Sequence, residues 1–235
     1  PARHGATSSP YPMRPTSQLS LLFWKNLCYN HYEVFQALPW FFTSHQPLGN
    51  LFLERMICMN IWHDISPKRI KADDFFAVIE ITKGGKAKYE MDKETGLLRL
   101  DRVLYTSTHY PANYGFIPRT FANDGDPLDV LVLCSENIIP MSLVRCYPIG
   151  VIIMDDGGSE DEKIIAIPFD DPTYNNYTDI TQLPKHIFDE MQHFFTVYKQ
   201  LEDATHTQIG EVKDHEAAKN IVASCLERYL NDFCR

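Results

Sequence analysis

The sequence predicts an α+β protein, mainly β, in which a small β-barrel carries two helices on its outside. Short apolar or alternating segments, typical of strands, follow one another from residue 74 to residue 167. Helical periodicity begins only after them, over residues 183–198 and 214–233. Because strands and helices are segregated along the chain, a wound βαβ sheet is not expected. Strand spacing alone does not distinguish an OB-type barrel from a sandwich.

The strand region contains several short segments bounded by turn residues. The predicted strands cover residues 75–81, 87–91, 97–104, 131–133, 143–148, 151–154 and 163–167. Alternation over residues 87–91 places Lys88 and Glu90 on one strand face, where they form either a simple ion pair or part of a site. Residues 110–118, with two prolines and three aromatic residues, are expected to be irregular.

The stretch 124–130, Asp-Gly-Asp-Pro-Leu-Asp-Val, places three carboxylates within six positions. Gly125 and Pro127 bend the backbone sharply, so these carboxylates can converge on one point. Converging negative charges repel one another unless a cation lies between them, and hard divalent ions such as Mg²⁺ or Ca²⁺ prefer oxygen ligands. The alternative is a solvated acidic turn that binds no metal. Residues elsewhere in the chain are needed to distinguish the two interpretations.

Two C-terminal helices are predicted from apolar residues that recur at helical spacing. In the first helix Pro184 suits the opening turn. In the second, Asp214 is the expected N-cap.

Residues 1–58 differ in composition from the remainder of the chain. They contain two acidic residues against four lysines and arginines, and several prolines interrupt any long periodic element. We expect an atypical extension here, disordered or not native to the protein, with a targeting segment as the alternative. Residues 59–235 are expected to form the functional domain, with Met59 as the native start.

The net charge of −9 argues against a general surface for nucleic acid or for anionic membranes. The six cysteines show no disulfide or metal-ligand spacing, which favours reduced thiols. No run of eighteen apolar residues occurs. A soluble, cytoplasmic protein is therefore expected.

Charged and tyrosine side chains at strand ends and turns form the candidate site. The acids are Glu80, Glu90, Asp124, Asp126, Asp129, Asp156 and Asp161. The bases and tyrosines are Lys88, Arg102, Lys163, Lys199, Tyr110, Tyr114 and Tyr198. Metal ions held by the acids, with cationic donors nearby, would together bind a polyanion such as a phosphate compound.

These residues, in this order, resemble the family I soluble inorganic pyrophosphatases of bacterial type. The resemblance covers about residues 60–234. It rests on the 124–130 stretch, Glu80, Lys88-Tyr89-Glu90, Asp101-Arg102, the Tyr110–Gly115 segment, Asp156 with Asp161 and Lys163, and His193–Lys199. The family's fold is an OB-type five-stranded barrel with two flanking C-terminal helices, and its bacterial members are typically homo-hexamers.

The resemblance implies that several Mg²⁺ ions bind in each active site. Their ligands would be Glu80, Glu90, Asp124, Asp129, Asp156 and Asp161. Asp124 would bridge a primary pair of ions shared with Asp129 and Asp161, and Asp156 with Asp161 would meet a metal that arrives with substrate. Glu90 would act mostly through bound water. Related bacterial sequences often carry a further acid where this chain has Gly157.

The implied activity is Mg²⁺-dependent hydrolysis of pyrophosphate to two orthophosphates by direct attack of a metal-activated water. Asp126 resembles the general base of this reaction. The implied substrate clamp is Lys88, Arg102, Tyr114, Lys163, Tyr198 and Lys199.

Two other function classes stay open at this point. One is a non-catalytic OB-fold module for single-stranded nucleic acid, which would need a basic groove with stacking aromatic residues. The other is an inactive pyrophosphatase-like subunit that serves only in assembly. A simple Ca²⁺ loop is disfavoured, because residues 124–130 lack the spacing of an EF-hand.

Overall fold

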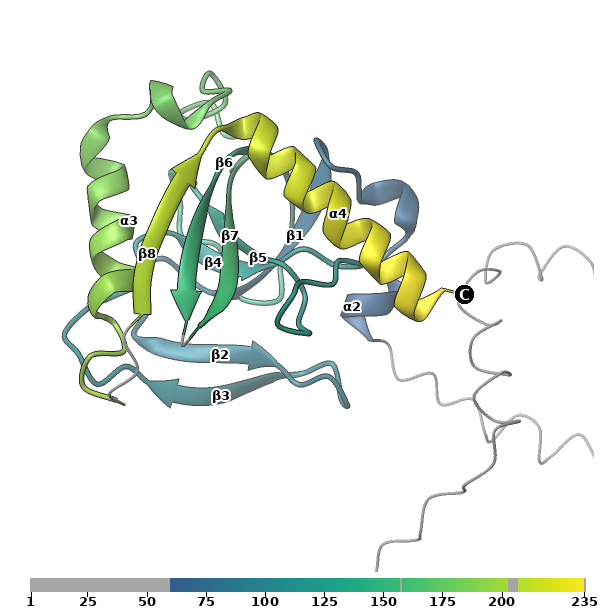
Figure 1. Ribbon diagram of the computed structural model, residues 1–235, viewed down its shortest axis with the longest axis horizontal. Coiled ribbons are helices and arrows are strands. Elements are labelled where there is room, and N and C mark those ends of the chain that lie inside the picture. Colours follow the sequence, from purple (N-terminus) through teal and green to yellow (C-terminus); the bar gives the residue numbers. More distant parts are fainter. Residues whose placement is uncertain (1–59, 157, 203–206, 235) are drawn as a thin grey trace, which may run out of the picture. The chain divides into compact units, whose positions relative to one another are not determined.

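Eight strands and two long helices make up the part of the chain that the computed structural model describes, residues 60–156, 158–202 and 207–234 (Figure 1). The strands are β1 (Phe75–Ile81), β2 (Ala87–Met91), β3 (Leu98–Val103), β4 (Asn113–Phe116), β5 (Asp129–Val132), β6 (Leu143–Asp156), β7 (Ser159–Pro168) and β8 (Thr207–Lys213). The predicted extension over residues 1–58 lies outside the described residues.

Five of these strands close into a ring. Each strand is hydrogen-bonded to the next in the order β1-β4-β5-β7-β6, and β6 pairs back with β1. The pairing of β5 with β7 is parallel, and the other pairs in the ring are antiparallel. β8 pairs with residues 151–156 of β6, beyond the part of β6 that pairs with β1. β2 and β3 form a separate hairpin across one end of the ring (Figure 1). The predicted mainly-β, OB-like architecture with five strands is confirmed.

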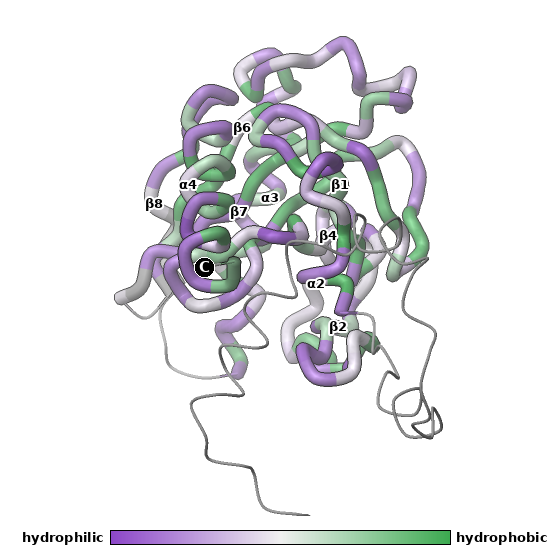
Figure 2. Tube along the Cα trace, turned by 90° about the vertical axis from the view of Figure 1, so that its right-hand side faces the viewer, coloured by the Kyte–Doolittle hydropathy of each residue, from purple (hydrophilic) through white to green (hydrophobic). Residues whose placement is uncertain are grey.

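Alternating side chains of the ring strands fill two hydrophobic cores. On β5, Leu131 belongs to a core shared with the first long helix, whereas Val130 and Val132 belong to a core shared with the second. This division follows from the period-two geometry of a strand, in which neighbouring side chains point to opposite faces. Figure 2 shows hydrophobic positions along the tube at β1 and β4, both strands of the ring.

The two long helices, α3 (Lys185–Val197) and α4 (His215–Phe233), lie on different sides of the β6–β8 strands (Figure 1). The Oδ1 atom of Asp214 accepts a hydrogen bond from the Ala217 N–H at 3.0 Å, so the predicted cap is confirmed. Shorter pieces are α2 (Ile61–Asp64), η2 (Pro67–Arg69) and η3 (Ile180–Gln182). Within the described residues, no helix has the length and apolar character needed to cross a bilayer.

Three local expectations were wrong. Residues 113–116 form the buried strand β4 rather than an irregular segment, because both edges of this short piece pair with other strands. The two strands expected over 143–154 are one continuous strand, β6, with an irregularity between Pro148 and Gly150. β8 was not predicted, since its pairing with β6 is a long-range contact that local pattern does not reveal.

Closure of the ring depends on the small size of Gly115 in β4. A Cβ atom at this position would lie 1.8 Å from the carbonyl oxygen of Val78 in β1. We expect Gly115→Ala to lower the free energy of unfolding by about 3 kcal/mol, because backbone has to move to relieve the clash. Urea titration followed by circular dichroism measures this loss. Gly210→Ala in β8 is the matched control, because its added methyl group meets the Ile153 oxygen only at 3.2 Å; equal losses in both variants would contradict the argument.

Candidate active site

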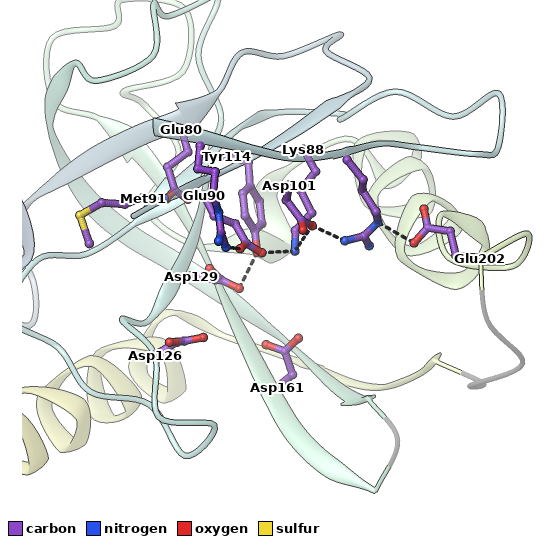
Figure 3. Close-up of polar contacts among 12 residues, drawn as sticks. Glu80, Lys88, Glu90, Met91, Asp101, Tyr114, Asp126, Asp129, Asp161 and Glu202 are labelled. Atoms are coloured by element: carbon purple, nitrogen blue, oxygen red, sulfur yellow. Dashed lines mark hydrogen bonds and ion pairs between the residues drawn. The ribbon is translucent and has the colours of Figure 1, made fainter. Parts of the chain in front are cut away.

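A cavity of about 490 Å³ opens between the β2–β3 hairpin, the 124–130 turn and helix α3. Of the predicted site residues whose side chains the structure describes, all except Arg102 line it. Those that line it are Glu80, Lys88, Glu90, Tyr110, Tyr114, Asp124, Asp126, Asp129, Asp161, Lys163, Tyr198 and Lys199. Figure 3 shows Asp126, Asp129 and Asp161 around the same space, with Lys88 and Glu90 of β2 above it. The fold therefore brings together residues that are up to 119 positions apart, from Glu80 to Lys199.

Lys163 is the central cation of this cavity. The parallel register of β5 and β7 sets Lys163 opposite Asp129, while Asp161 lies two positions earlier on β7. The Lys163 Nζ atom is 2.7 Å from Asp129 Oδ2 and 2.9 Å from Asp161 Oδ2, and its side chain is 3% exposed. Although burial alone would lower the pKa of Lys163, the two carboxylates raise it above its ordinary value. Lys163 is thus a permanently charged partner for both acids.

Two tyrosines extend this network. The Tyr114 hydroxyl donates a hydrogen bond of 2.5 Å to Asp129 Oδ2, and Lys163 Nζ donates one of 3.2 Å to the Tyr114 oxygen. Burial, with the charge of Asp129, raises the pKa of Tyr114 well above its ordinary value, so Tyr114 stays protonated. Tyr198 reaches the cavity from the end of α3, stacked against Phe194 with ring centroids 5.2 Å apart. Helix packing therefore fixes the position of this hydroxyl.

The 124–130 turn presents Asp124 and Asp126 to the cavity from a sharp bend. Gly125 has a φ of +86°, a conformation that favours glycine, and the Asp126 N–H donates to Asp124 Oδ1 at 3.0 Å. Burial, together with the charges of Asp126, Asp129 and Asp161, raises the pKa of Asp124. Asp126 is exposed and forms an ion pair with Lys93 of the hairpin loop. The carboxylates of the turn are thus crowded, as the sequence predicted.

A chain of ion pairs runs from β2 to the segment that follows α3 (Figure 3). Lys88 Nζ lies 2.5 Å from Glu90 Oε1 and 3.4 Å from Asp101 Oδ2. Asp101 also contacts Arg102, whose Nε lies 2.6 Å from Glu202 Oε2. Arg102 is therefore held beside the cavity rather than in its lining. The ion pair expected between Lys88 and Glu90 is present, and both residues line the cavity.

Glu80 lies at the back of the cavity, on β1, and is 7% exposed. Its Oε1 atom accepts a hydrogen bond of 2.7 Å from the Met91 N–H, which ties β1 to β2. Burial raises the pKa of Glu80 to about 8, an effect that the Met91 hydrogen bond opposes in part. Near neutral pH this carboxyl group favours its protonated form.

This raised pKa makes stability depend on pH. Below about pH 4.5 Glu80 is protonated in both folded and unfolded chains, so its stabilising contribution is fully present. As the pH rises toward about 8 the unfolded chain releases the proton first, and that contribution is lost. In EDTA, we expect the parent protein to lose on the order of 4 kcal/mol between pH 5 and 8 relative to Glu80→Gln. Urea titrations of both proteins across this range measure the difference; a difference that does not change with pH would contradict the prediction.

Comparison with known proteins shows the family of the chain. Residues 77–230 match the family model of inorganic pyrophosphatase. Soluble inorganic pyrophosphatase 2 of Chlamydomonas reinhardtii is 47% identical over 172 residues, which are 73% of this chain and 89% of the relative. The chain belongs to the inorganic pyrophosphatase family.

Solved pyrophosphatase structures show the same fold. The Helicobacter pylori enzyme aligns with a TM-score of 0.66 and 43% identity, over 68% of this chain and 95% of that one. The Thermus thermophilus enzyme aligns with a TM-score of 0.67 and 36% identity, over 73% of this chain and 99% of that one. Both of these solved chains are covered almost completely.

Membership of the pyrophosphatase family implies a metal-dependent enzyme. The donors that line the cavity fit a hard divalent cation, because they are carboxylate oxygens, and Asp124 has the raised pKa that a nearby cation would relieve. Within the described ranges, however, no three carboxylate, His or Cys side chains converge closely enough to hold an ion. Instead, Asp129 and Asp161 form ion pairs with Lys163, and Asp126 forms one with Lys93.

Several pyrophosphatase site residues were missed by sequence reasoning. Lys93, Arg99 and Phe195 line the cavity, and Glu202 holds Arg102 from outside it. Glu202 gave no signal of helical spacing, since it lies in the turns that follow α3. Lys93 gave no such signal, because a hairpin loop has no periodicity. The backbone of Asp156 ends β6, whereas its side chain and Gly157 lie outside what the structure describes.

Proposed function

We propose that this chain hydrolyses inorganic pyrophosphate to two orthophosphates, as expected of an inorganic diphosphatase. The observation that carries the proposal is one cavity lined by both carboxylates and basic side chains. The buried Lys163 stands between Asp129 and Asp161, beside the Asp124–Asp126 turn. Such a site can bind a compact polyanion and a divalent cation together, which suits phosphoryl transfer.

The side chains of the cavity divide into substrate-binding and proton-accepting groups. Lys88, Lys163 and Lys199 supply positive charge to the phosphoryl groups, and Tyr114 and Tyr198 supply hydroxyl donors. Arg102, held between Asp101 and Glu202, completes the clamp from the hairpin side. Asp126, an exposed acid of the turn, accepts the proton of the attacking water. No Ser, Cys or His lines the described cavity, so direct attack by water is favoured over a covalent phosphoenzyme.

The metal that fits these donors is Mg²⁺, with several ions in each site. The residues that would hold it are Glu80, Glu90, Asp124, Asp129, Asp156 and Asp161. When bound, such ions lower the pKa of a coordinated water and neutralise charge on the phosphoryl group. Glu80 is the least suited of the six, because its burial favours the protonated form, which is a poorer ligand.

Phosphate release from pyrophosphate tests the proposed function. The purified chain should release two phosphates per pyrophosphate in the presence of Mg²⁺, and EDTA should abolish this release. Removal of the metal is expected to lower the rate by at least 10²-fold, since charge neutralisation at the phosphoryl group is lost. A chain that binds pyrophosphate but releases no phosphate at any Mg²⁺ concentration would instead fit an inactive assembly subunit.

We further propose that the chain forms a homo-oligomer, with the hexamer as the expected size, and that it works in the cytoplasm. Support comes from the resemblance to bacterial pyrophosphatases and from apolar side chains exposed on β3 and beside it, Leu97, Leu100, Val103 and Tyr105. Light scattering on the full chain and on residues 59–235 measures the assembly and the effect of the extension. No observation favours nucleic acid as a partner.

A further inference from the structure

Lys93 lies in the loop that joins β2 to β3, on the rim of the cavity, and none of the roles above uses it. Its ammonium group forms an ion pair with Asp126, the proposed base. The two side chains are 51% and 54% exposed, so water and ions can reach the pair. A divalent cation arriving at the turn would therefore encounter Asp126 already neutralised by a residue of the chain itself.

A second set of contacts holds Lys93 in this place. The Lys93 carbonyl oxygen accepts a hydrogen bond of 3.1 Å from Asn60 Nδ2, and its ammonium group lies 5.6 Å from the centre of the Trp62 ring. Trp62 is buried, and its Nε1 atom donates a hydrogen bond of 2.9 Å to the carbonyl oxygen of Thr120, shortly before the acidic turn. The hairpin loop and the acidic turn are thus linked through Asn60 and Trp62 as well as through the ion pair.

The other carboxylates of the turn region are held differently. Asp129 and Asp161 share Lys163, which is buried and cannot leave the site without leaving charge unpaired. Asp124 makes no ion pair with any described residue, and it lines the same cavity as three other carboxylates, Asp126, Asp129 and Asp161. A cation drawn to Asp124 would repel the Lys93 ammonium group on the neighbouring Asp126. The exposed pair is the one that can break at low cost.

We propose that Lys93 is a positioning residue that neutralises Asp126 in the metal-free enzyme and leaves it when a divalent cation binds. Lys93 and the cation then compete for the acidic turn, so the Lys93–Asp126 ion pair lowers the affinity for the cation, and a bound cation weakens the ion pair. Departure of Lys93 frees the Asp126 carboxylate to accept a proton. This role rests on the proposed function for Asp126, but the competition itself requires only metal and protein.

Calorimetric titration of the metal-free full chain with MgCl₂, without pyrophosphate, tests the competition. Lys93→Gln should bind Mg²⁺ about three- to tenfold more tightly than the parent, because a positive charge has been removed beside the turn. Lys93→Arg keeps the charge and should match the parent. Lys185→Gln is the matched control, since Lys185 forms an exposed pair with Asp189 on α3, away from the cavity. Unchanged or weaker Mg²⁺ binding by Lys93→Gln, or an equal gain in Lys185→Gln, would overturn the proposal.

Fluorescence of Trp62 tests the departure of Lys93 separately. In a Trp24→Phe, Trp40→Phe background Trp62 is the remaining tryptophan of the chain, and Lys93 lies over its ring. Mg²⁺ should change its emission, and Lys93→Gln should reduce that change at least twofold. An emission that does not respond to Mg²⁺ in the parent, or responds equally in Lys93→Gln, would show that Lys93 stays in place. Failure of pyrophosphate hydrolysis would leave both measurements unaffected, so the two proposals fail independently.

Discussion

Asp126→Asn is expected to lower kcat for pyrophosphate hydrolysis by about 10²- to 10⁴-fold, the range that a general base contributes. Asparagine has nearly the same shape as aspartate but does not accept the proton of the attacking water. Asp126 is half-exposed, and among the described residues it pairs with the exposed Lys93, so the fold should persist. Phosphate release under saturating Mg²⁺ and pyrophosphate measures kcat, and thermal unfolding measures the fold.

Asp189→Asn provides the control for this experiment. Asp189 also pairs with an exposed lysine, Lys185, but on α3 and outside the cavity lining. Its substitution should leave kcat within about twofold of the parent, since exposed pairs contribute little. If Asp126→Asn retained near-parent kcat while remaining folded, the assignment of Asp126 as the base would be rejected, although the chain could still be a pyrophosphatase.

Lys163→Met is expected to produce the largest combined loss of stability and activity. Methionine matches the length of lysine but carries no charge, so Asp129 and Asp161 are left facing each other without their cation. Removing one partner of a buried ion pair costs about 3 kcal/mol or more in the free energy of unfolding. For a domain of this size that equals a fall in Tm of roughly 6–12 °C. Activity should fall by at least about 10²-fold, because a donor to the phosphoryl groups is lost.

The metal dependence of this loss distinguishes an electrostatic cause from poor packing. In EDTA the two carboxylates repel each other, whereas Mg²⁺ can supply the missing charge, so the deficit in Tm should shrink when Mg²⁺ is added. Differential scanning calorimetry in both conditions measures the two deficits. Lys185→Met, at an exposed position, should have the same Tm as the parent in each condition. A Lys163→Met protein as stable as the parent in EDTA would contradict the central role of this ion pair.

Much of the fold follows from local pattern. Residues 75–81 are apolar and β-branched, which is enough to indicate β1, and the apolar stripe with its Asp214 cap is enough to indicate α4. β4 and β8 were not predicted, because what makes them strands is pairing with partners distant in the chain. The residue pattern of a short segment does not show which distant strands it will pair with, so it does not predict a strand there.

The chemical content of the site was determined by the sequence alone. The spacing of Asp124, Asp126 and Asp129 around Gly125 and Pro127 specifies a crowded acidic turn, because those residue types bend the chain and repel one another wherever the turn is placed. What only the tertiary structure decided is which charge faces which. The parallel register of β5 with β7 places Lys163 in ion pairs with Asp129 and Asp161. The β2–β3 hairpin places Lys93 in an ion pair with Asp126. Ion pairs act over a few ångströms in space, so packing, and not order along the chain, assigns them.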